Sequence, residues 1–248
     1  GSPAYIVYGM RAVSRLMLWS YAHTWRSTYA PHESAAKTAY QVMQRGESPG
    51  EDEVDRACAA FAATEGRAAF RMVCSKLTVS YWDDSVYDAA KALLEAVLSA
   101  AVADSDRLTG SAVFDLVRKM DFTRAVRKHA AWQDLAFWEG VLTTKIEEAK
   151  AARMQTMRTI AGDTDQAAEE SKLAAQETKS LMLHMLEFRL PKNDPGGIAE
   201  FLSSATVLSD ALSGEDKQDV ENYLAGLEED SDEEEDDFAE AVPPAGET

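Results

Sequence analysis

The sequence predicts an all-α fold, an irregular multi-helix bundle or short helical solenoid of about eight to nine helices with a disordered acidic C-terminal tail. Apolar residues recur at steps of three and four along most of the chain, the spacing of amphipathic helices. The chain has 248 residues, 46% of them hydrophobic, which is enough to bury a substantial core. Acidic residues collect at the C-terminal end. We therefore expect a tag-cleavage scar at 1–3, one helical domain at 4–227 and the tail at 228–248.

Two helices and one ambiguous segment are expected before residue 83. Residues 5–29 carry an apolar helical stripe, and 33–44 is expected to form a short helix that ends at a Gly/Pro cluster. Three acids at the start of 51–77 favour a helix N-terminus there. Gly66 lies inside this segment and costs roughly 1 kcal/mol against alanine. The segment is thus either two helices or one helix approached closely by a neighbour, and 78–82 is expected to be a connector.

The central helices differ in how apolar they are. Residues 83–85 supply caps for a helix whose nearly uniform apolar sequence places it at the centre of the fold. A second helix is expected at 109–121, with Thr109 or Ser111 as its cap. A third runs over 132–160. Its first half is aromatic and is expected in the core, whereas its second half is polar and is expected to project.

The last helices follow from apolar patterns separated by breakers. Residues 163–190 are polar first and then densely apolar, and a proline ends the pattern. An Asn-Asp-Pro-Gly-Gly turn occupies 193–197. Two closing helices are expected at 198–212 and 215–227, with Gly214 between them.

Charge divides the chain into a body and a tail. The formal net charge is −18, yet residues 228–248 contain eleven acids and no Lys or Arg, which leaves about −7 for the rest. A body of this charge argues against direct binding to nucleic acid, which needs a basic face. Ser231 is a candidate phosphosite because acids surround it. The acidic run comprises Glu228, Glu229, Asp230, Asp232, Glu233, Glu234, Glu235, Asp236 and Asp237.

Cysteine and histidine spacing predicts no metal site. Cys58 and Cys74 are too few for a disulfide framework and lie in no CxxC motif, so we expect small buried residues in a reducing compartment. The four histidines, His23, His32, His129 and His184, show no HExxH or i, i+4 pairing. His184 lies on an apolar helix face and is expected to be a hydrogen-bonded core residue.

No catalytic, cofactor-binding or membrane-spanning motif is recognised in the sequence. It contains no GxSxG, GxGxxG or phosphate-binding loop, and adjacent acids diverge around a helix instead of converging. No run approaches the roughly 18 apolar residues of a membrane span. We expect a cytoplasmic protein without catalytic residues or cofactor. The densest aromatic cluster, Trp132, Phe137 and Trp138, is either core or a partner-binding surface.

A family resemblance is carried mainly by aromatic and aliphatic residues. They are Gly66-Arg67 with Phe70; Val86-Tyr87, Leu93 and Val97-Leu98; Leu116 to Met120 with Phe122; Trp132, Leu135 and Phe137-Trp138-Glu139; and His184-Met185-Leu186 with Phe188 and Leu190. Across roughly residues 60–225 the chain resembles the helical domain of the SET-binding-factor group of myotubularin-related pseudophosphatases. It is similar also to the helical C-terminal region of some DENN-containing Rab exchange factors and to a small free-standing neuronal protein family. The resemblance implies a helical fold without exchange activity, because that activity belongs to a separate DENN module.

Three functional hypotheses follow. The leading one is a non-enzymatic protein-binding module, a scaffold or adaptor in membrane trafficking or cytoskeletal organisation, that offers a groove to a partner helix or a small GTPase. The second is an acidic-tailed chaperone that binds a basic client such as a histone. The third is an enzyme with an unrecognised helical site. The sequence leaves the oligomeric state open.

Overall fold

The computed structural model describes residues 33–75, 83–157 and 166–227. The all-α prediction is confirmed, because the described residues form eleven α-helices and contain no strand. The expected helix at 5–29, the connector at 78–82 and the acidic tail with Ser231 lie outside the described residues.

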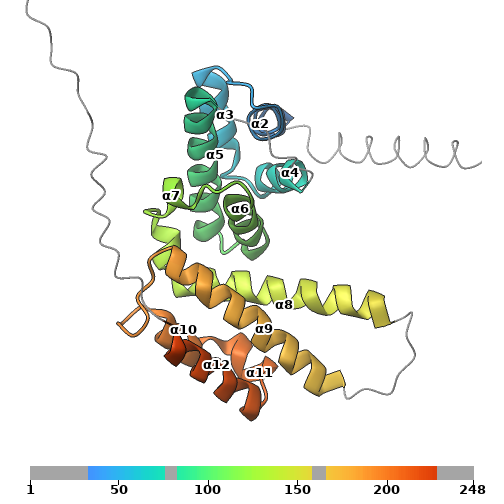
Figure 1. Cartoon of the computed structure of the whole chain (residues 1–248). Helices are drawn as coiled ribbons and strands as arrows, with labels where there is room; N and C mark the ends of the chain where they lie inside the picture. Colours follow the sequence, from blue (N-terminus) through green and yellow to red (C-terminus); the bar gives the residue numbers. More distant parts are fainter. Residues whose placement is uncertain (1–32, 76–82, 158–165, 228–248) are drawn as a thin grey trace, which may run out of the picture.

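The helices follow one another with short connections, and α8 and α9 are the longest. Figure 1 shows α2 to α7 gathered at one end of the molecule and α8 to α12 at the other, with α6 lying next to α8. Their bounds are α2 (Glu33–Tyr40), α3 (Glu51–Ala60), α4 (Thr64–Cys74), α5 (Asp84–Ala103), α6 (Arg107–Lys119), α7 (Thr123–Val126), α8 (Leu135–Met157), α9 (Gln166–Glu187), α10 (Ile198–Ser204), α11 (Thr206–Ala211) and α12 (Gly214–Gly226). A π-turn, η2 (Gln41–Arg45), follows α2, and a 3-10 turn, η3 (Ala130–Gln133), precedes α8.

The ambiguous segment after residue 50 is two helices. α3 starts at Glu51 as expected, and the Glu53 carboxylate accepts a hydrogen bond from the Gly50 N–H. The chain turns after Ala60 and α4 begins at Thr64. Gly66 therefore lies in the first turn of α4 instead of interrupting one long helix.

Two predicted helix starts are wrong by a few residues. α6 begins at Arg107, and its cap is Asp106, whose carboxylate accepts from the Thr109 N–H, instead of Thr109 or Ser111. α8 begins at Leu135 instead of Trp132, which lies in η3. In both cases an aspartate carboxylate accepts a backbone N–H at the observed start, Asp106 from Thr109 and Asp134 from Ala136.

The predicted helix at 198–212 is also wrong, because it is broken at Ala205 into α10 and α11. Ala205 occupies the N-cap of α11 and has no side chain that can cap it. The cap comes instead from Glu139 of α8, whose Oε1 accepts from Thr206 N–H at 2.7 Å, Thr206 Oγ1 at 2.6 Å and Val207 N–H at 3.2 Å. These hydrogen bonds, led by the Thr206 hydroxyl, hold the pKa of Glu139 below its ordinary value.

We expect Glu139→Ala to lower the free energy of unfolding by about 1 kcal/mol, the usual loss for a removed helix cap. The first backbone amides of α11 would lose their acceptor, so hydrogen exchange there should accelerate. Chemical denaturation and exchange mass spectrometry measure the two effects. Glu147→Ala on the same helix is the matched control, since its exposed ion pair with Arg107 caps no helix. Equal losses from both variants would contradict the capping role.

The buried apolar residues form one cluster that extends from Ala39 in α2 to Leu224 in α12. α8 and α9 run side by side, and their far ends extend beyond the other helices (Figure 1). Ion pairs, Lys150–Glu170 and Arg153–Glu169, join the two helices there. Met154 is 53% exposed, so the described part of the second half of the predicted helix, which ends at Met157, projects as expected.

The turn between α9 and α10 depends on a glycine without room for a side chain. A Cβ on Gly197 would lie 2.2 Å from the Pro191 carbonyl oxygen and 2.9 Å from that of Asp194. Both are backbone atoms, and the same Pro191 oxygen accepts from the Ile198 N–H that starts α10.

We expect Gly197→Ala to cost about 1–3 kcal/mol, because the turn has to open to accept the methyl group. Thermal and urea unfolding measure the loss. Gly214→Ala is the matched control, since nothing lies within 4 Å of its Cβ position at the first residue of α12. A Gly197→Ala variant as stable as Gly214→Ala would refute this account of the turn.

No helix among residues 33–75, 83–157 and 166–227 is long and apolar enough to cross a membrane.

Candidate functional site

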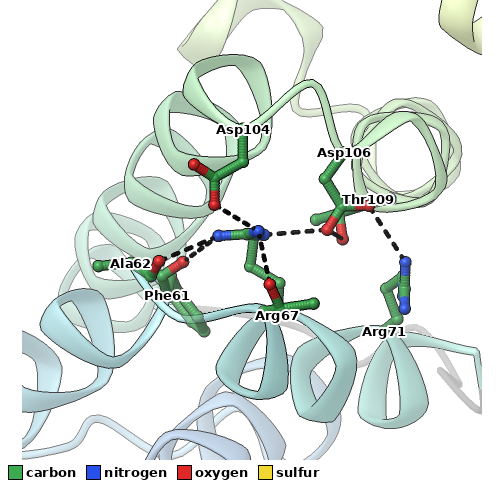
Figure 2. Close-up of polar contacts among 8 residues, drawn as sticks. Phe61, Ala62, Arg67, Arg71, Asp104, Asp106 and Thr109 are labelled. Atoms are coloured by element: carbon green, nitrogen blue, oxygen red, sulfur yellow. Dashed lines mark hydrogen bonds and ion pairs between the residues drawn. The ribbon is translucent and has the colours of Figure 1, made fainter.

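The most extensive polar network of the described chain surrounds Arg67 in α4 (Figure 2). Its side chain is only 1% exposed. Nε donates to Asp106 Oδ2 at 2.9 Å, and Nη2 lies 2.7 Å from Asp104 Oδ2. Nη1 donates to the carbonyl oxygens of Phe61 at 2.9 Å and Ala62 at 3.3 Å. The guanidinium thus joins the α3–α4 turn to the α5–α6 turn.

The hydrogen-bonding groups at the centre of this network are occupied within the chain. Arginine has five N–H donors, and with a further bond from Nη2 to Thr64 Oγ1 all five have acceptors. Asp106 is equally occupied, since it accepts from Arg67, Arg71 and both the N–H and hydroxyl of Thr109. With the five donors of Arg67 and both oxygens of Asp106 used within the chain, the centre of the network stabilises the fold.

The charges of the network agree with this structural role. Burial raises the pKa of Asp106, but hydrogen bonds from Arg67 and Thr109 outweigh burial and hold it below its ordinary value. Burial likewise opposes the charge of Arg67, and its bonds to Asp106 and Asp104 raise its pKa in spite of this. Both groups therefore stay ionised around neutral pH. Catalytic acids and bases instead have pKa values shifted toward the working pH.

The potential nucleophiles are not activated. Cys58 and Cys74 are partly buried and therefore more exposed than predicted from the sequence. Burial raises the pKa of each thiol. Lys145 of α8 lies 2.5 Å from Asp115 Oδ2 and 3.1 Å from Glu148 Oε2. Burial opposes its charge, but these contacts raise its pKa. A nucleophilic thiol or amine needs the opposite shift.

His184 is a core residue with a hydrogen-bond partner, as predicted. It is 9% exposed, and Nδ1 lies 2.9 Å from Glu187 Oε2. Burial lowers its pKa, and the contact with Glu187 only partly opposes this. In the part of the chain that the structure describes, no three His, Cys, Asp or Glu residues are grouped so as to hold a metal ion.

The predicted aromatic cluster lies in the core. Trp132 and Trp138 are 0% exposed and Phe137 is 8% exposed. The Trp132 ring stacks on Phe188 at 4.0 Å between centroids, and its Nε1–H donates to the Val126 carbonyl at 2.8 Å. Trp138 Nε1–H donates to the Trp132 carbonyl at 2.8 Å. These rings have no free face for a partner.

A shallow groove open to solvent lies between α10, α11 and α12. Apolar side chains line it, and polar ones stand at its rim: Leu202, Ala205, Leu208, Leu212 and Val220 with Ser203, Ser209, Lys217 and Glu221. The sequence analysis did not single out this groove. The spaced apolar residues from 202 to 212 are visible in the sequence. They line a groove only because the helix breaks at Ala205 and because α12 packs beside them.

Comparison of the chain with models of known protein families, with curated proteins and with solved structures finds no match.

Proposed function

We propose that this chain is a non-enzymatic protein-binding module and that the groove between α10, α11 and α12 receives an amphipathic helix of a partner protein. The observation that carries the proposal is a groove open to solvent and lined by apolar side chains of α10, α11 and α12. The resemblance to helical domains of trafficking proteins is the reason for proposing a scaffold or adaptor in membrane trafficking or cytoskeletal organisation.

The rim of the groove fits a helix better than a small molecule. Lys217 and Glu221 are exposed, opposite in charge and four residues apart, so they lie one turn apart on the same face of α12. A partner helix could insert an apolar stripe between α11 and α12. Charged residues beside that stripe would then pair with Lys217 and Glu221. A small GTPase that offers a helix is one such partner.

Affinity recovery from native cell extract tests the proposal. The bait is the full chain, compared with a groove variant, Leu212→Gln with Lys217→Glu, and a matched control, Leu183→Gln with Lys172→Glu. Leu183 and Lys172 are exposed residues of α9 outside the groove. We expect the groove variant to recover at least about tenfold less of its specific partner than the full chain does. This factor corresponds to a loss of about 1.4 kcal/mol in binding free energy. A peptide copied from the recovered partner's helix should then compete with it.

Two results would reject the proposal. One is recovery of the same proteins by the groove variant and the control variant. The other is turnover of a small molecule by the purified chain without any specific protein partner.

The second candidate function is an acidic chaperone. It is supported by the sequence of residues 228–237, nine of which are acidic. Binding of purified histone to the full chain and to a chain ending at Leu227 separates the two candidates. The chaperone reading requires that the shorter chain loses histone binding and that binding by the full chain weakens steeply with salt. The groove reading requires that partner recovery survives removal of the tail.

A further inference from the structure

A histidine lies where the two ends of the molecule are joined. η3 connects α7 to α8, and therefore connects the helices α2 to α7 with the helices α8 to α12 (Figure 1). His129 is the N-cap residue of η3. Its Nδ1 accepts a hydrogen bond from the Ala131 N–H at 3.2 Å, and its Nε2 lies 2.8 Å from Ser99 Oγ on α5. The imidazole thus caps η3 and ties it to α5.

The hydrogen bonds around the imidazole define its tautomer. A backbone N–H can only donate, so Nδ1 has to be unprotonated. In the neutral ring the proton then lies on Nε2, which donates to Ser99 Oγ. The Ser99 hydroxyl in turn donates to the Glu95 carbonyl oxygen at 2.8 Å. Because Nε2 already carries a proton, the histidine cannot take the proton of Ser99, and the pair is not a nucleophile with its base.

A protonated His129 is incompatible with this cap. A proton on Nδ1 would face the Ala131 N–H, and two donors cannot form a hydrogen bond with each other. The same turn contains Trp132, whose N–H donates to the His129 carbonyl at 3.2 Å and whose Nε1–H donates to the Val126 carbonyl at 2.8 Å. Loss of the cap would therefore weaken the segment that holds α7 next to α8.

Burial and one carboxylate act on His129 in opposite directions. Burial, the larger effect, lowers the pKa of the imidazole, and Glu95, one helical turn before Ser99 on α5, raises it. The neutral ring that caps η3 is thus the favoured form around neutral pH. The elements around the ring and their connections carry further charged residues, which are Lys91, Arg124, Arg127, Lys128, Asp134 and Glu139.

We propose that His129 is a pH-sensitive switch at the junction of α7 and α8. The neutral imidazole caps η3 and holds it to α5. Uptake of one proton at Nδ1 removes the acceptor of the Ala131 N–H, so the junction opens on mild acidification, the range in which histidine changes charge.

The direction of the effect follows from the pKa of His129. In the open junction the exposed ring has its ordinary pKa, near 6.5, whereas the pKa of the capping ring is lower. The stabilisation by the cap is therefore fully present above about pH 6.5 and is lost as the pH falls through the lower value of the closed junction.

NMR of the imidazole nitrogens in the full chain tests the geometry. At pH 8 we expect the Nε2–H tautomer for His129, and on acidification a pKa below the ordinary value. Glu95→Gln removes the charge that favours the imidazolium but keeps the carbonyl that accepts from Ser99, so it should lower the pKa of His129 further. An Nδ1–H tautomer, or a pKa at or above the ordinary value, would overturn the proposal.

Amide exchange measures the opening itself. The protection factors of the Ala131 and Trp132 amides should fall at least about threefold between pH 7.5 and 5.5, within the tenfold per pH unit that uptake of one proton allows. His129→Asn is the matched variant, because asparagine can cap η3 through Oδ1 but does not titrate. Its protection factors should change by less than about twofold over this range. His184 titrates in both proteins, so its effect cancels in the comparison. An equal pH dependence in the parent and in His129→Asn would overturn the proposal.

Discussion

Replacing Arg67 with methionine is expected to lower the free energy of unfolding by about 3–5 kcal/mol, the range for breaking a buried ion pair from one side. Methionine fills much of the space but has no donor. Asp106, whose side chain is 14% exposed, would then keep only the Arg71 ion pair and the Thr109 hydrogen bonds for its largely buried charge. The carbonyl oxygens of Phe61 and Ala62 would also lose the Nη1 donor that they share.

Two comparison variants separate the network from a simple loss of charge. Arg67→Lys keeps the charge but has three donors for five acceptors, so it should recover only part of the loss. Arg71→Met removes a half-exposed partner with one 3.3 Å bond to Asp106, and should cost about 1 kcal/mol or less. Urea denaturation measures all three. An Arg67→Met variant within 1 kcal/mol of the parent would contradict the assigned role.

A double variant tests the coupling between Arg67 and Asp106. Asp106→Asn removes the charge but keeps an efficient helix cap for α6. Once Arg67 is methionine, the neutral amide is less costly to bury than the carboxylate, so the loss for Arg67→Met with Asp106→Asn should be smaller than the sum of the single losses. Additive losses would show that the two side chains act independently.

The ion pair between Arg67 and Asp106 also predicts that the free energy of unfolding depends on pH in the acid range. The pKa of Asp106 is lowered in the fold, so its contribution is fully present above its unfolded pKa, near 3.9. It is lost as the pH falls through the lower folded value. In Arg67→Met the largest opposing hydrogen bond is lost, so burial raises the pKa of Asp106 relative to the parent, although Thr109 and Arg71 still lower it. The variant should gain stability relative to the parent as the pH falls below about 5.

Local sequence patterns were sufficient for the fold class and for several helix ends. Asp83 caps α5 by accepting from the Val86 N–H at 3.0 Å, as predicted, because a cap depends on residues three apart. The buried face of α5 likewise follows from its own apolar spacing. Helix formation and burial are here decided within one or two turns of chain.

The features missed by the sequence analysis depend on contacts between distant segments. Arg67 meets Asp106 across 39 residues, and Glu139 caps α11 across 67 residues. No local pattern links either pair. The cluster of five basic residues within residues 118–128 was missed for a different reason, because averaging the charge over the body gave about −7 and concealed it.

Replacing Trp132 with alanine is expected to cost about 3–5 kcal/mol, the range for large-to-small changes of a fully buried aromatic. Trp132 is the only described residue that both stacks on Phe188 of the α9–α10 connection and donates to Val126 of α7. Its loss would leave a cavity among Phe137, Trp138 and Phe188, and the Val126 carbonyl would keep only the His129 N–H as a donor.

Trp132→Phe separates packing from hydrogen bonding. Phenylalanine keeps a ring against Phe188 but has no donor for the Val126 carbonyl, so a loss of roughly 1–3 kcal/mol is expected. Leu108→Ala, a 50% exposed site, is the control and should change stability by no more than about 0.5 kcal/mol.

Because Trp132 anchors α7, amide exchange there should accelerate more than in α3 in both Trp132 variants. Unchanged exchange in α7 would show that Phe122 and Val126 alone hold this segment in place.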